Sequence, residues 1–524
     1  MQVKTLNKKL SLSQSPYEVY QRLSNNGQKS HTALLETAEA GTHNYQKSIL
    51  MLSAAVKISA MNRKVIMQAL NPNGEAFLKA FDTQHIPSKE ISKGNSVISF
   101  CISKQELCVD EKQRLLQQSI LTVLKEVTRQ LQTDSVHDNA TSFLIGAFSF
   151  DLVDQFEVVP QINKQDEDLC FYLADQLLIQ SVDSQTASIV VKGFADYAEN
   201  TIRLGLNLSH LNELLDAPVS ELMVSHVANS IAVNTTDDEY AEMVASAKRH
   251  IIDGDVFQVV LSRTYAVDCA NALDSYRVLR KNNPSPYMYF INFGDKQLFG
   301  ASPESALKVD INQEISLYPI AGTRRRAVGN GSFDYEKDSK IELELIQDEK
   351  ENAEHMMLVD LARNDLARII KTGTRRISKL KQVVKYSHVM HLVSEVKGAL
   401  KSEMDCFDAY RACANMGTLT GAPKIKACEI IRQLENKPRG LYGGAVALVN
   451  ANLEFDSAII IRSAVVKDDI AYISAGAGIV YDSNPELEAQ ETYNKAKAVI
   501  DACLSSNQNL TEVLEYSLSK ESVA

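Results

Sequence analysis

Two segments of the sequence each carry a pair of glutamates spaced three residues apart. Glu351 and Glu354 form one pair, and Glu488 and Glu491 form the other. On a helix, side chains with this spacing share one face, where two carboxylates repel each other unless a cation lies between them. Four carboxylates from two helices would suit Mg²⁺, which prefers oxygen ligands, uses one or two carboxylates directly and keeps several waters. A solvated acidic helix end remains the alternative for each pair.

Three other segments contain polar or glycine residues that a hydrophobic core does not require. Arg462 interrupts the apolar run "SAIIIRSAVV", and a buried guanidinium there needs an anionic partner, either a substrate or a structural carboxylate. Gly476 and Gly478 in "ISAGAGIV" allow backbone N–H groups to approach an anion, although such glycines also occur in simple turns. Thr418 in "ANMGTLTGAPK" offers a hydroxyl group in a turn that could equally be a plain helix break.

Composition excludes several classes of protein. The chain has 524 residues, 45% hydrophobic residues and a formal charge of −11, which is typical of a globular protein and unlike a nucleic-acid-binding surface. No apolar run approaches the roughly 20 residues that span a bilayer, and the N-terminus lacks a signal-peptide pattern. The eight cysteines form no CxxC pair. We therefore expect a cytoplasmic protein that binds neither nucleic acid nor membrane.

The pattern of elements favours an α+β fold. Thr236 and Glu239 form a capping box that begins a helix, and strand-like runs such as "VFQVVLSRTYAV" follow. Helices are expected at about 335–369, 405–416, 422–434 and 485–504. Strand runs followed by helices predict large, mostly antiparallel sheets flanked by helices. A stretch near residues 210–236 that ends in polar residues suggests a boundary between two domains, at 1–215 and 235–505.

Ten motifs in a fixed order resemble the chorismate-utilising enzymes. They span about 235–505, and "LLETAEAG" at 34–41 further resembles the large subunits of anthranilate synthases. The motifs are "FQVVLSR", "ASPE", "YPIAGTRRR", "ENAEHMMLVDLARND", "YSHVMHLVSEVKG", "GTLTGAPK", "YGGAV", "IIIRSA", "AGAGIV" and "ELEAQET". The resemblance implies a complex two-domain chorismate-utilising fold, with an N-terminal domain that carries part of a regulatory site and a C-terminal domain that is catalytic.

The resemblance also implies a role for each candidate residue. Mg²⁺ would bridge a chorismate carboxylate through Glu354 and Glu491, with Glu351 and Glu488 as ligands or outer-shell groups. The imidazole of His391 would act as general acid or base, a role suited to a pKa near 7. The remaining contacts to chorismate would come from Gly322 and Thr323 on the ring side, Thr418 near the ring hydroxyl, Tyr442 and Arg462 at the enolpyruvyl carboxylate, and the backbone of Gly476, Ala477 and Gly478.

Two positions indicate which nucleophile attacks the ring. Relatives that add water carry lysine where Gln258 stands, and aminodeoxychorismate synthases carry lysine where Ala321 stands. The resemblance therefore implies ammonia as the nucleophile, with anthranilate and pyruvate as products, in the first committed step of tryptophan biosynthesis. Isochorismate or salicylate synthase, aminodeoxychorismate synthase and an inactive sensing protein on the same scaffold remain alternatives.

The resemblance implies two further binding partners. Because no glycine-flanked cysteine resembles a glutaminase nucleophile and little chain follows residue 505, we expect ammonia from a separate glutamine amidotransferase subunit, with two copies of each chain. Tryptophan would inhibit by binding at a regulatory site. Its predicted residues are Glu36, Thr37, Lys47, Pro286, Tyr287 and Met288, with Thr37 replacing the serine usual in the family.

Overall fold

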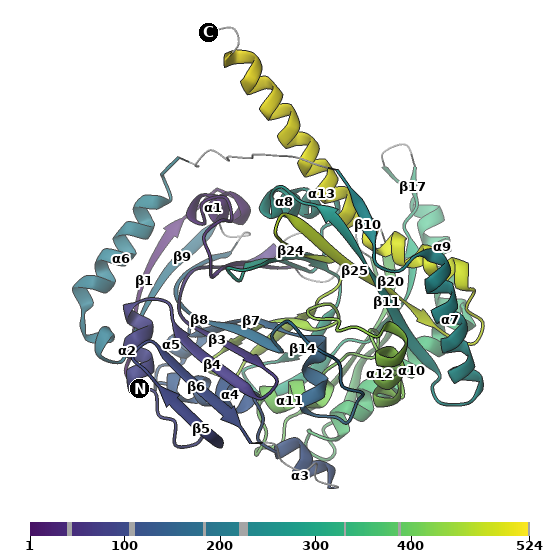
Figure 1. The fold of residues 1–524 in the computed structure, drawn as a ribbon, viewed down its shortest axis with the longest axis horizontal. Helices are drawn as coiled ribbons and strands as arrows, with labels where there is room; N and C mark the ends of the chain where they lie inside the picture. Colours follow the sequence, from purple (N-terminus) through teal and green to yellow (C-terminus); the bar gives the residue numbers. More distant parts are fainter. Residues whose placement is uncertain are drawn as a thin grey trace.

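Two layers of antiparallel strands, with helices on their outer faces, make up the protein (Figure 1). The computed structural model describes residues 1–38, 45–103, 110–181, 185–218, 229–329, 332–385 and 389–521. Long strands β3 (Tyr45–Met61) and β8 (Leu169–Ser181) pair with each other along their length and belong to both layers. Their register shifts near Ser53, where the paired strands pass from one layer to the other.

The first layer joins strands from both halves of the chain. β8 pairs with β9, and β3 pairs with β2, which continues the sheet to β12 and onward. Its strands lie in the spatial order β1 (Val3–Ser11), β9 (Thr186–Phe194), β8, β3, β2 (Thr32–Ala38), β12 (Tyr287–Asn292), β13 (Gln297–Ser302), β24 (Ser463–Lys467), β25 (Ile470–Ile479), β11 (Gln258–Asp268) and β10 (Ile231–Val233), with β21 (Gly421–Ala422) also on β11.

The second layer is built in the same way from the other halves of β3 and β8. Its strands are β5 (Ser88–Lys93), β6 (Val97–Ile102), β4 (Lys64–Ala69), β7 (Phe143–Phe148), β22 (Ala445–Asn450), β23 (Phe455–Ile459), β14 (Ser305–Val309), β15 (Glu314–Leu317) and β20 (Val389–Ala399), with β16 (Ile320–Arg325) and β19 (Arg376–Lys385) on β20. β17 (Val328–Gly329) and β18 (Ser332–Phe333) form a separate pair.

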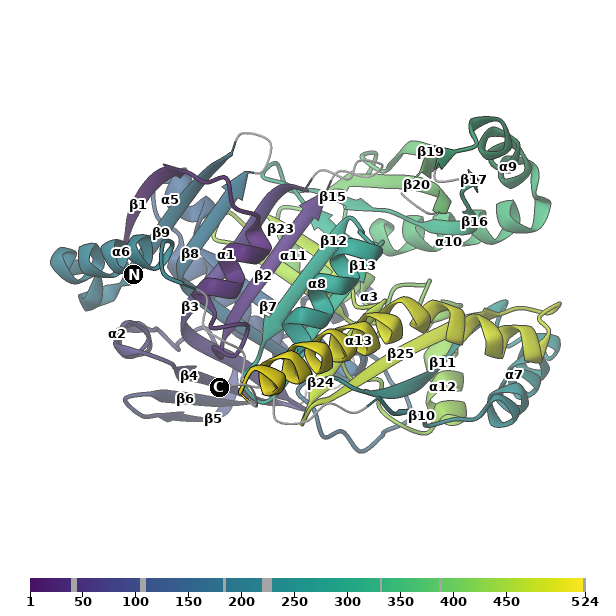
Figure 2. The same cartoon turned by 90° about the horizontal axis from the view of Figure 1, so that it is seen from above.

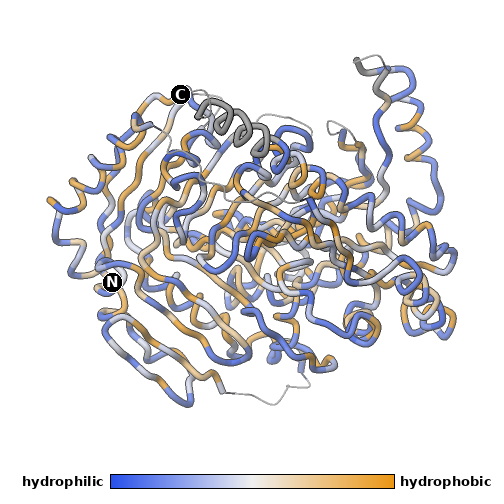
Figure 3. Tube along the Cα trace, turned by 45° about the horizontal axis from the view of Figure 1, so that its top comes forward, coloured by the Kyte–Doolittle hydropathy of each residue, from blue (hydrophilic) through white to orange (hydrophobic). Residues whose placement is uncertain are grey.

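Helices cover the outer faces of both layers. They are α1 (Pro16–Leu23), α2 (Pro72–Ala80), α3 (Glu111–Leu116), α4 (Leu121–Leu131), α5 (Val136–Ala140), α6 (Thr201–Leu214), α7 (Asp237–Ile252), α8 (Ala272–Asn282), α9 (Tyr335–Gln347), α10 (Glu349–Ala367), α11 (Cys406–Cys413), α12 (Lys424–Glu435) and α13 (Pro485–Glu521), with short 3₁₀ helices η1 (Phe150–Gln155) and η2 (Ala195–Glu199). Apolar residues concentrate along the central strands, and peripheral helices alternate apolar and polar residues (Figure 3). None of the described helices is both long and apolar enough to cross a membrane.

Most of the predicted elements are present, and three differ in detail. The helix expected at 485–504 continues to Glu521 as α13. The α+β class and the capping box of Thr236 and Glu239 are confirmed. The helix expected at 335–369 is two helices, because Asp348 leaves the helical conformation and caps α10 with its carboxylate. The run around Arg462 is two strands, β23 and β24. Hydrogen-bonded pairs β2–β12 and β7–β22 cross the predicted domain boundary, part of which (219–228) lies outside the described residues.

Candidate functional site

A cavity of about 660 Å³ lies between two lobes of the molecule. One lobe carries β16, β20, α9 and α10, and the other carries β11, β25, α7 and α13 (Figure 2). The cavity brings together most of the residues that the sequence singled out, although they come from distant parts of the chain. The predicted residues that line it are Gly322, Thr323, Glu351, Glu354, His391, Thr418, Tyr442, Arg462, Gly476, Gly478, Glu488 and Glu491.

Basic side chains balance part of the charge of the four glutamates. Arg324 donates to Glu351 at 2.7 Å, and Lys495 pairs with Glu491 at 2.6 Å. Lys350 lies 3.9 Å from the carboxylate of Glu354. The repulsion expected between neighbouring carboxylates is therefore reduced by side chains that the sequence analysis did not assign to the site.

The donor set of this acidic cluster fits Mg²⁺. Burial raises the pKa of Glu354, and the nearby carboxylates of Glu351, Glu488 and Glu491 raise it further against the effect of Lys350. A raised carboxyl pKa marks a place where a cation is favourable. Within the described residues no three acidic, histidine or cysteine side chains converge as a complete metal site. Mg²⁺ needs only one or two protein carboxylates, which Glu354 and Glu491 can supply from facing helices.

Arg462 presents an unpaired positive charge to the cavity. The residue connects β23 to β24 in a left-handed conformation, with φ of 51°, rather than lying within a continuous strand. No side chain or carbonyl among the described residues forms a hydrogen bond or ion pair with its guanidinium. Burial lowers its pKa, and Tyr442, Glu491 and Glu304 are the charged or polar groups that oppose this. The expected alternative of a structural ion pair is not observed, so the guanidinium can accept an anionic ligand.

His391 lies on β20 and is held by the adjacent strand β16. Its Nδ1 is 2.9 Å from the hydroxyl oxygen of Thr323. Burial lowers the pKa of His391 to about 4, a backbone hydrogen bond with Gly322 raises it, and the charge of Arg462 lowers it. This differs from the value near 7 that its predicted role suggested. The imidazole is neutral at neutral pH and can accept a proton.

Glu304 is the clearest candidate functional residue on the cavity wall that the sequence analysis did not assign. It ends the quoted motif "ASPE", and its carboxyl accepts a 2.9 Å hydrogen bond from the hydroxyl of Thr418. Burial raises its pKa to about 8, while Thr418, Arg462 and Lys495 lower it. Glu304 is therefore mostly protonated at neutral pH. An acidic residue directly after a strand and a proline was the available signal, but its burial could not be read from spacing.

Two glycines of β25 lie on the cavity wall, whereas the residue between them does not. Gly476 and Gly478 line the cavity, and a side chain at Gly476 would collide with the hydroxyl of Tyr442 and the carbonyl of Leu261. Ala477 is fully buried in the apolar cluster under α7 and α12 and is absent from the cavity wall, because successive strand residues face opposite sides. Lys495, also missed, donates to the carbonyl of Gly476 at 2.9 Å.

Comparison with known proteins agrees with this geometry. Residues 87–501 match the family model described as chorismate binding enzyme. The chain belongs to the chorismate-binding enzymes. It is similar to anthranilate synthase component 1 of Buchnera aphidicola subsp. Baizongia pistaciae (43% identity, covering 93% of this chain and 94% of the relative) and of Escherichia coli K12 (42%, 91% and 92%).

A solved structure places the chain in the same group. The crystal structure of anthranilate synthase component I from Streptococcus pneumoniae TIGR4 is 31% identical, with a TM-score of 0.70 over 87% of this chain and 92% of that one. This chain is therefore an enzyme of the chorismate-binding family, in its anthranilate synthase component 1 group. The predicted family and fold are confirmed.

A second cavity, of about 480 Å³, lies between the two strand layers. It is lined by five of the six residues predicted for regulation, namely Glu36, Thr37, Lys47, Tyr287 and Met288. The pairing of β2 with β3 and β12 brings them together, with Thr37 opposite both Lys47 and Tyr287. Pro286 is buried beside β12 and is absent from the cavity wall.

Glu36 belongs to the wall of this second cavity, but its carboxylate is already bound by side chains of α8. It accepts hydrogen bonds from Tyr276 at 2.5 Å and from Arg280 at 2.8 Å, on the face of β2 that packs against α8. Its side chain is fully buried in this pair. The acidic groups that the cavity does present are Glu454 and Asp456, with Asp456 3.3 Å from Lys308.

Proposed function

We propose that the chain converts chorismate and ammonia to anthranilate and pyruvate in a Mg²⁺-dependent reaction. The observation that carries this proposal is the position of Glu304, whose buried carboxyl has a raised pKa, and of His391, whose buried imidazole has a lowered pKa, in one cavity beside the unpaired guanidinium of Arg462. An addition that expels a hydroxyl group needs a proton donor, and the elimination that follows it needs a proton acceptor.

Chorismate carries two carboxylates, and the cavity offers a separate cationic region for each. Arg462 and the hydroxyl of Tyr442 suit the enolpyruvyl carboxylate, with backbone groups at Gly476 and Gly478 beside it. Mg²⁺, when bound by Glu354 and Glu491, supplies a positive charge for the ring carboxylate. The ring then lies between Thr323 and Thr418, which fixes it relative to the two proton-transferring groups.

The protons balance with these two residues. Glu304 donates its proton to the C4 hydroxyl, which leaves as water while ammonia forms a bond to C2 and the two ring double bonds shift. The ammonium formed at C2 then returns one proton to Glu304, which restores its acid form. The Thr418 hydroxyl holds the Glu304 carboxyl in place throughout. His391 then removes the C2 proton, the C3–O bond breaks, and the enolpyruvyl group leaves as pyruvate after its methylene carbon gains a proton. The ring becomes aromatic as anthranilate.

The expected nucleophile follows from two positions of the cavity wall that carry no lysine. Gln258 and Ala321 line it where lysines activate water or form other products in similar enzymes. Ammonia needs no base, but it is mostly protonated at neutral pH, so a partner subunit that hydrolyses glutamine would supply it. None of the described cysteines lines this cavity, and all but the exposed Cys101 are buried. We propose a separate glutaminase subunit, in an assembly with two of each chain.

The purified chain alone is expected to form anthranilate from chorismate with ammonium salts and not with glutamine. Its rate should rise with pH as ammonium loses its proton, and should level off or fall above about pH 8, where free Glu304 loses its proton. Anthranilate fluorescence measures both rates. Adding the partner should restore glutamine use. Glutamine-dependent turnover by this chain alone would contradict the proposal.

We further propose that tryptophan binds in the second cavity and inhibits. The apolar walls suit an indole ring, Lys47 suits the amino-acid carboxylate, and Asp456 or Glu454 suits the ammonium group in place of the paired Glu36. The two cavities share structure, because β14 begins directly after Glu304 and its far end carries Lys308. β23 likewise runs from Asp456 toward Arg462. Such shared strands can transmit a change at one cavity to the other.

Lys47→Ala should relieve tryptophan inhibition without changing turnover in its absence. Loss of the charge that holds the amino-acid carboxylate weakens binding, and a coupling of ~1–3 kcal/mol corresponds to about 5- to 150-fold in affinity. The chain contains no tryptophan, so the emission of added tryptophan reports binding directly. Lys64→Ala, on the exposed end of β4, is the control. Inhibition of Lys47→Ala at the wild-type concentration would exclude this site.

A further inference from the structure

One buried guanidinium contacts three of the segments that form the active-site cavity. Arg439 donates to the carbonyl of Leu419, next to Thr418, at 2.7 Å. It also donates to the carbonyl of Val260, on the strand that begins with Gln258, at 2.7 Å. Its side chain is 2% exposed and itself does not line the cavity. Arg439 therefore ties together walls of the cavity from behind.

The third segment is the turn that carries Tyr442. The guanidinium carbon of Arg439 lies 5.8 Å from the centre of the Tyr442 ring and 4.6 Å from that of Phe150, so it lies close to both aromatic rings. Burial raises the pKa of Tyr442 to about 12, and the charge of Arg439 lowers it. The hydroxyl of Tyr442 thus stays protonated and able to donate a hydrogen bond.

Glu435 completes this arrangement and fixes Arg439. It accepts from Nε of Arg439 at 2.9 Å, and its other oxygen accepts from the backbone N–H of Ser262 at 2.7 Å. The planar guanidinium donates two hydrogen bonds to the carboxylate of Glu435, and its remaining N–H groups donate to the two carbonyls. A lysine has three donors on one nitrogen and cannot reproduce this set of directions.

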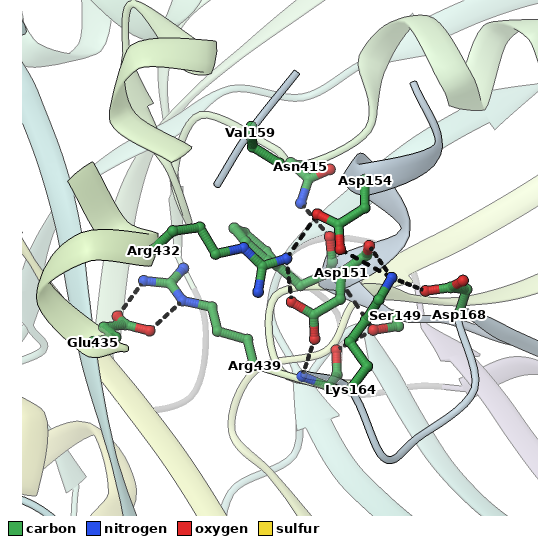
Figure 4. A network of polar contacts seen from close by, with 12 residues as sticks. Ser149, Asp151, Asp154, Val159, Lys164, Asp168, Asn415, Arg432, Glu435 and Arg439 are labelled. Carbon is green, nitrogen blue, oxygen red and sulfur yellow. Dashed lines mark hydrogen bonds and ion pairs between the residues drawn. The ribbon is translucent and has the colours of Figure 1, made fainter. Parts of the chain in front are cut away.

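A larger ionic network supports the same turn from η1 (Figure 4). Asp151 accepts from the backbone N–H of Gly440 at 2.7 Å and pairs with Arg432 at 2.7 Å. Asp154 joins Arg432 to Lys164, which also pairs with Asp168 at 2.6 Å. All these charges are buried and paired, which makes the backbone around Gly440 difficult to displace.

We propose that Arg439 is a positioning residue for the reaction, which aligns the Thr418 turn and the Tyr442 hydroxyl through its contacts with Leu419, Val260 and the Tyr442 ring. This proposal rests on the function proposed above. Thr418 in turn holds Glu304, so Arg439 acts on proton transfer without touching the substrate. Small misplacements of reacting groups can cost about 10²-fold in rate.

Arg439→Lys should lower kcat by about 10- to 100-fold with a smaller change in KM, because Arg462 and the acidic cluster still bind chorismate. The alkaline limb of its pH profile should move to higher pH, since the Thr418 hydrogen bond lowers the pKa of Glu304 and is loosened in the variant. Arg411→Lys is the matched control, because Arg411 also donates to backbone carbonyls and faces the ring of Phe156 but does not line this cavity.

Thermal unfolding and a second variant separate positioning from folding. Phe150→Leu removes the ring beside the guanidinium while leaving its hydrogen bonds, and it should lower kcat in the same direction by a smaller factor. If Arg439→Lys does not fold, the kcat of Phe150→Leu alone tests the positioning role of Arg439. Wild-type kcat in the folded variants, or a loss equal to that of Arg411→Lys with an unmoved pH profile, would overturn the proposal. A wild-type chain that forms no anthranilate would instead refute the proposed function.

Discussion

Glu304→Gln is expected to lower kcat for anthranilate formation by about 10²- to 10⁴-fold, the usual contribution of a general acid or base. Glutamine keeps the size of the side chain and can still accept the Thr418 hydrogen bond, but it has no proton to give to the leaving hydroxyl. Chorismate binding should change little, because Arg462 and the acidic cluster are untouched. The measurement is steady-state turnover with ammonium, with chorismate affinity determined separately.

The pH profile makes this prediction specific to proton donation. Burial raises the pKa of Glu304 to about 8, so the acid form is present below that pH and is lost as pH rises through it. Glu304→Gln should lack this alkaline limb and retain only the rise that comes from free ammonia. Glu314→Gln, on β15 and paired with Arg376 outside the cavity, is the control and should behave as wild type. If the turnover of Glu304→Gln falls at the same alkaline pH as that of the wild type, the fall is caused by another group.

Glu354→Gln and Glu491→Gln are expected to abolish Mg²⁺-dependent turnover while leaving the fold intact. Each removes one carboxylate from the acidic cluster, and Mg²⁺ held by one or two protein carboxylates cannot lose one without a large fall in affinity. Glu351→Gln and Glu488→Gln should cost less, about 10- to 100-fold, as expected for outer groups. Calorimetric titration with Mg²⁺ measures binding independently of activity.

Exposed glutamates on the same helices provide controls for this second prediction. Glu349 lies two residues before Glu351 in the first turn of α10, and Glu486 lies in the first turn of α13. Neither residue lines the cavity. Their glutamine variants remove the same charge from the same helix without touching the site. Turnover near wild type in Glu354→Gln, with unchanged Mg²⁺ affinity, would show that the cluster does not hold the cation.

Local patterns in the sequence predicted much of the fold and many of the residues that line the active-site cavity. Helix periodicity placed Glu488 and Glu491 off the apolar stripe of α13, and the structure shows both on the cavity wall. The capping box at Thr236 and the proline at the start of α13 were equally local signals. The ordered motifs then brought distant residues into one expected site, which residue spacing alone could not do.

What the sequence did not predict depends on long-range packing. The low pKa of His391 and the high pKa of Glu304 both arise from burial, and the segments that bury them come from distant parts of the chain. Glu36 pairs with Arg280 because α8, which is distant in sequence, packs against β2 and binds this carboxylate. Arg324 and Arg439 were missed for the same reason, since each binds groups that are distant in sequence. Lys495 pairs with Glu491 four residues away on the same helix, so its spacing was a local signal that the sequence analysis did not use.

Isotope labelling of the product tests the central claim most directly. The chain should be incubated with chorismate, Mg²⁺ and ¹⁵N-ammonium at alkaline pH, and the products separated and weighed by mass spectrometry. The proposed reaction predicts fluorescent anthranilate that carries ¹⁵N, together with pyruvate. Isochorismate or salicylate without ¹⁵N, a labelled aminodeoxychorismate formed without pyruvate, or unchanged chorismate would contradict it.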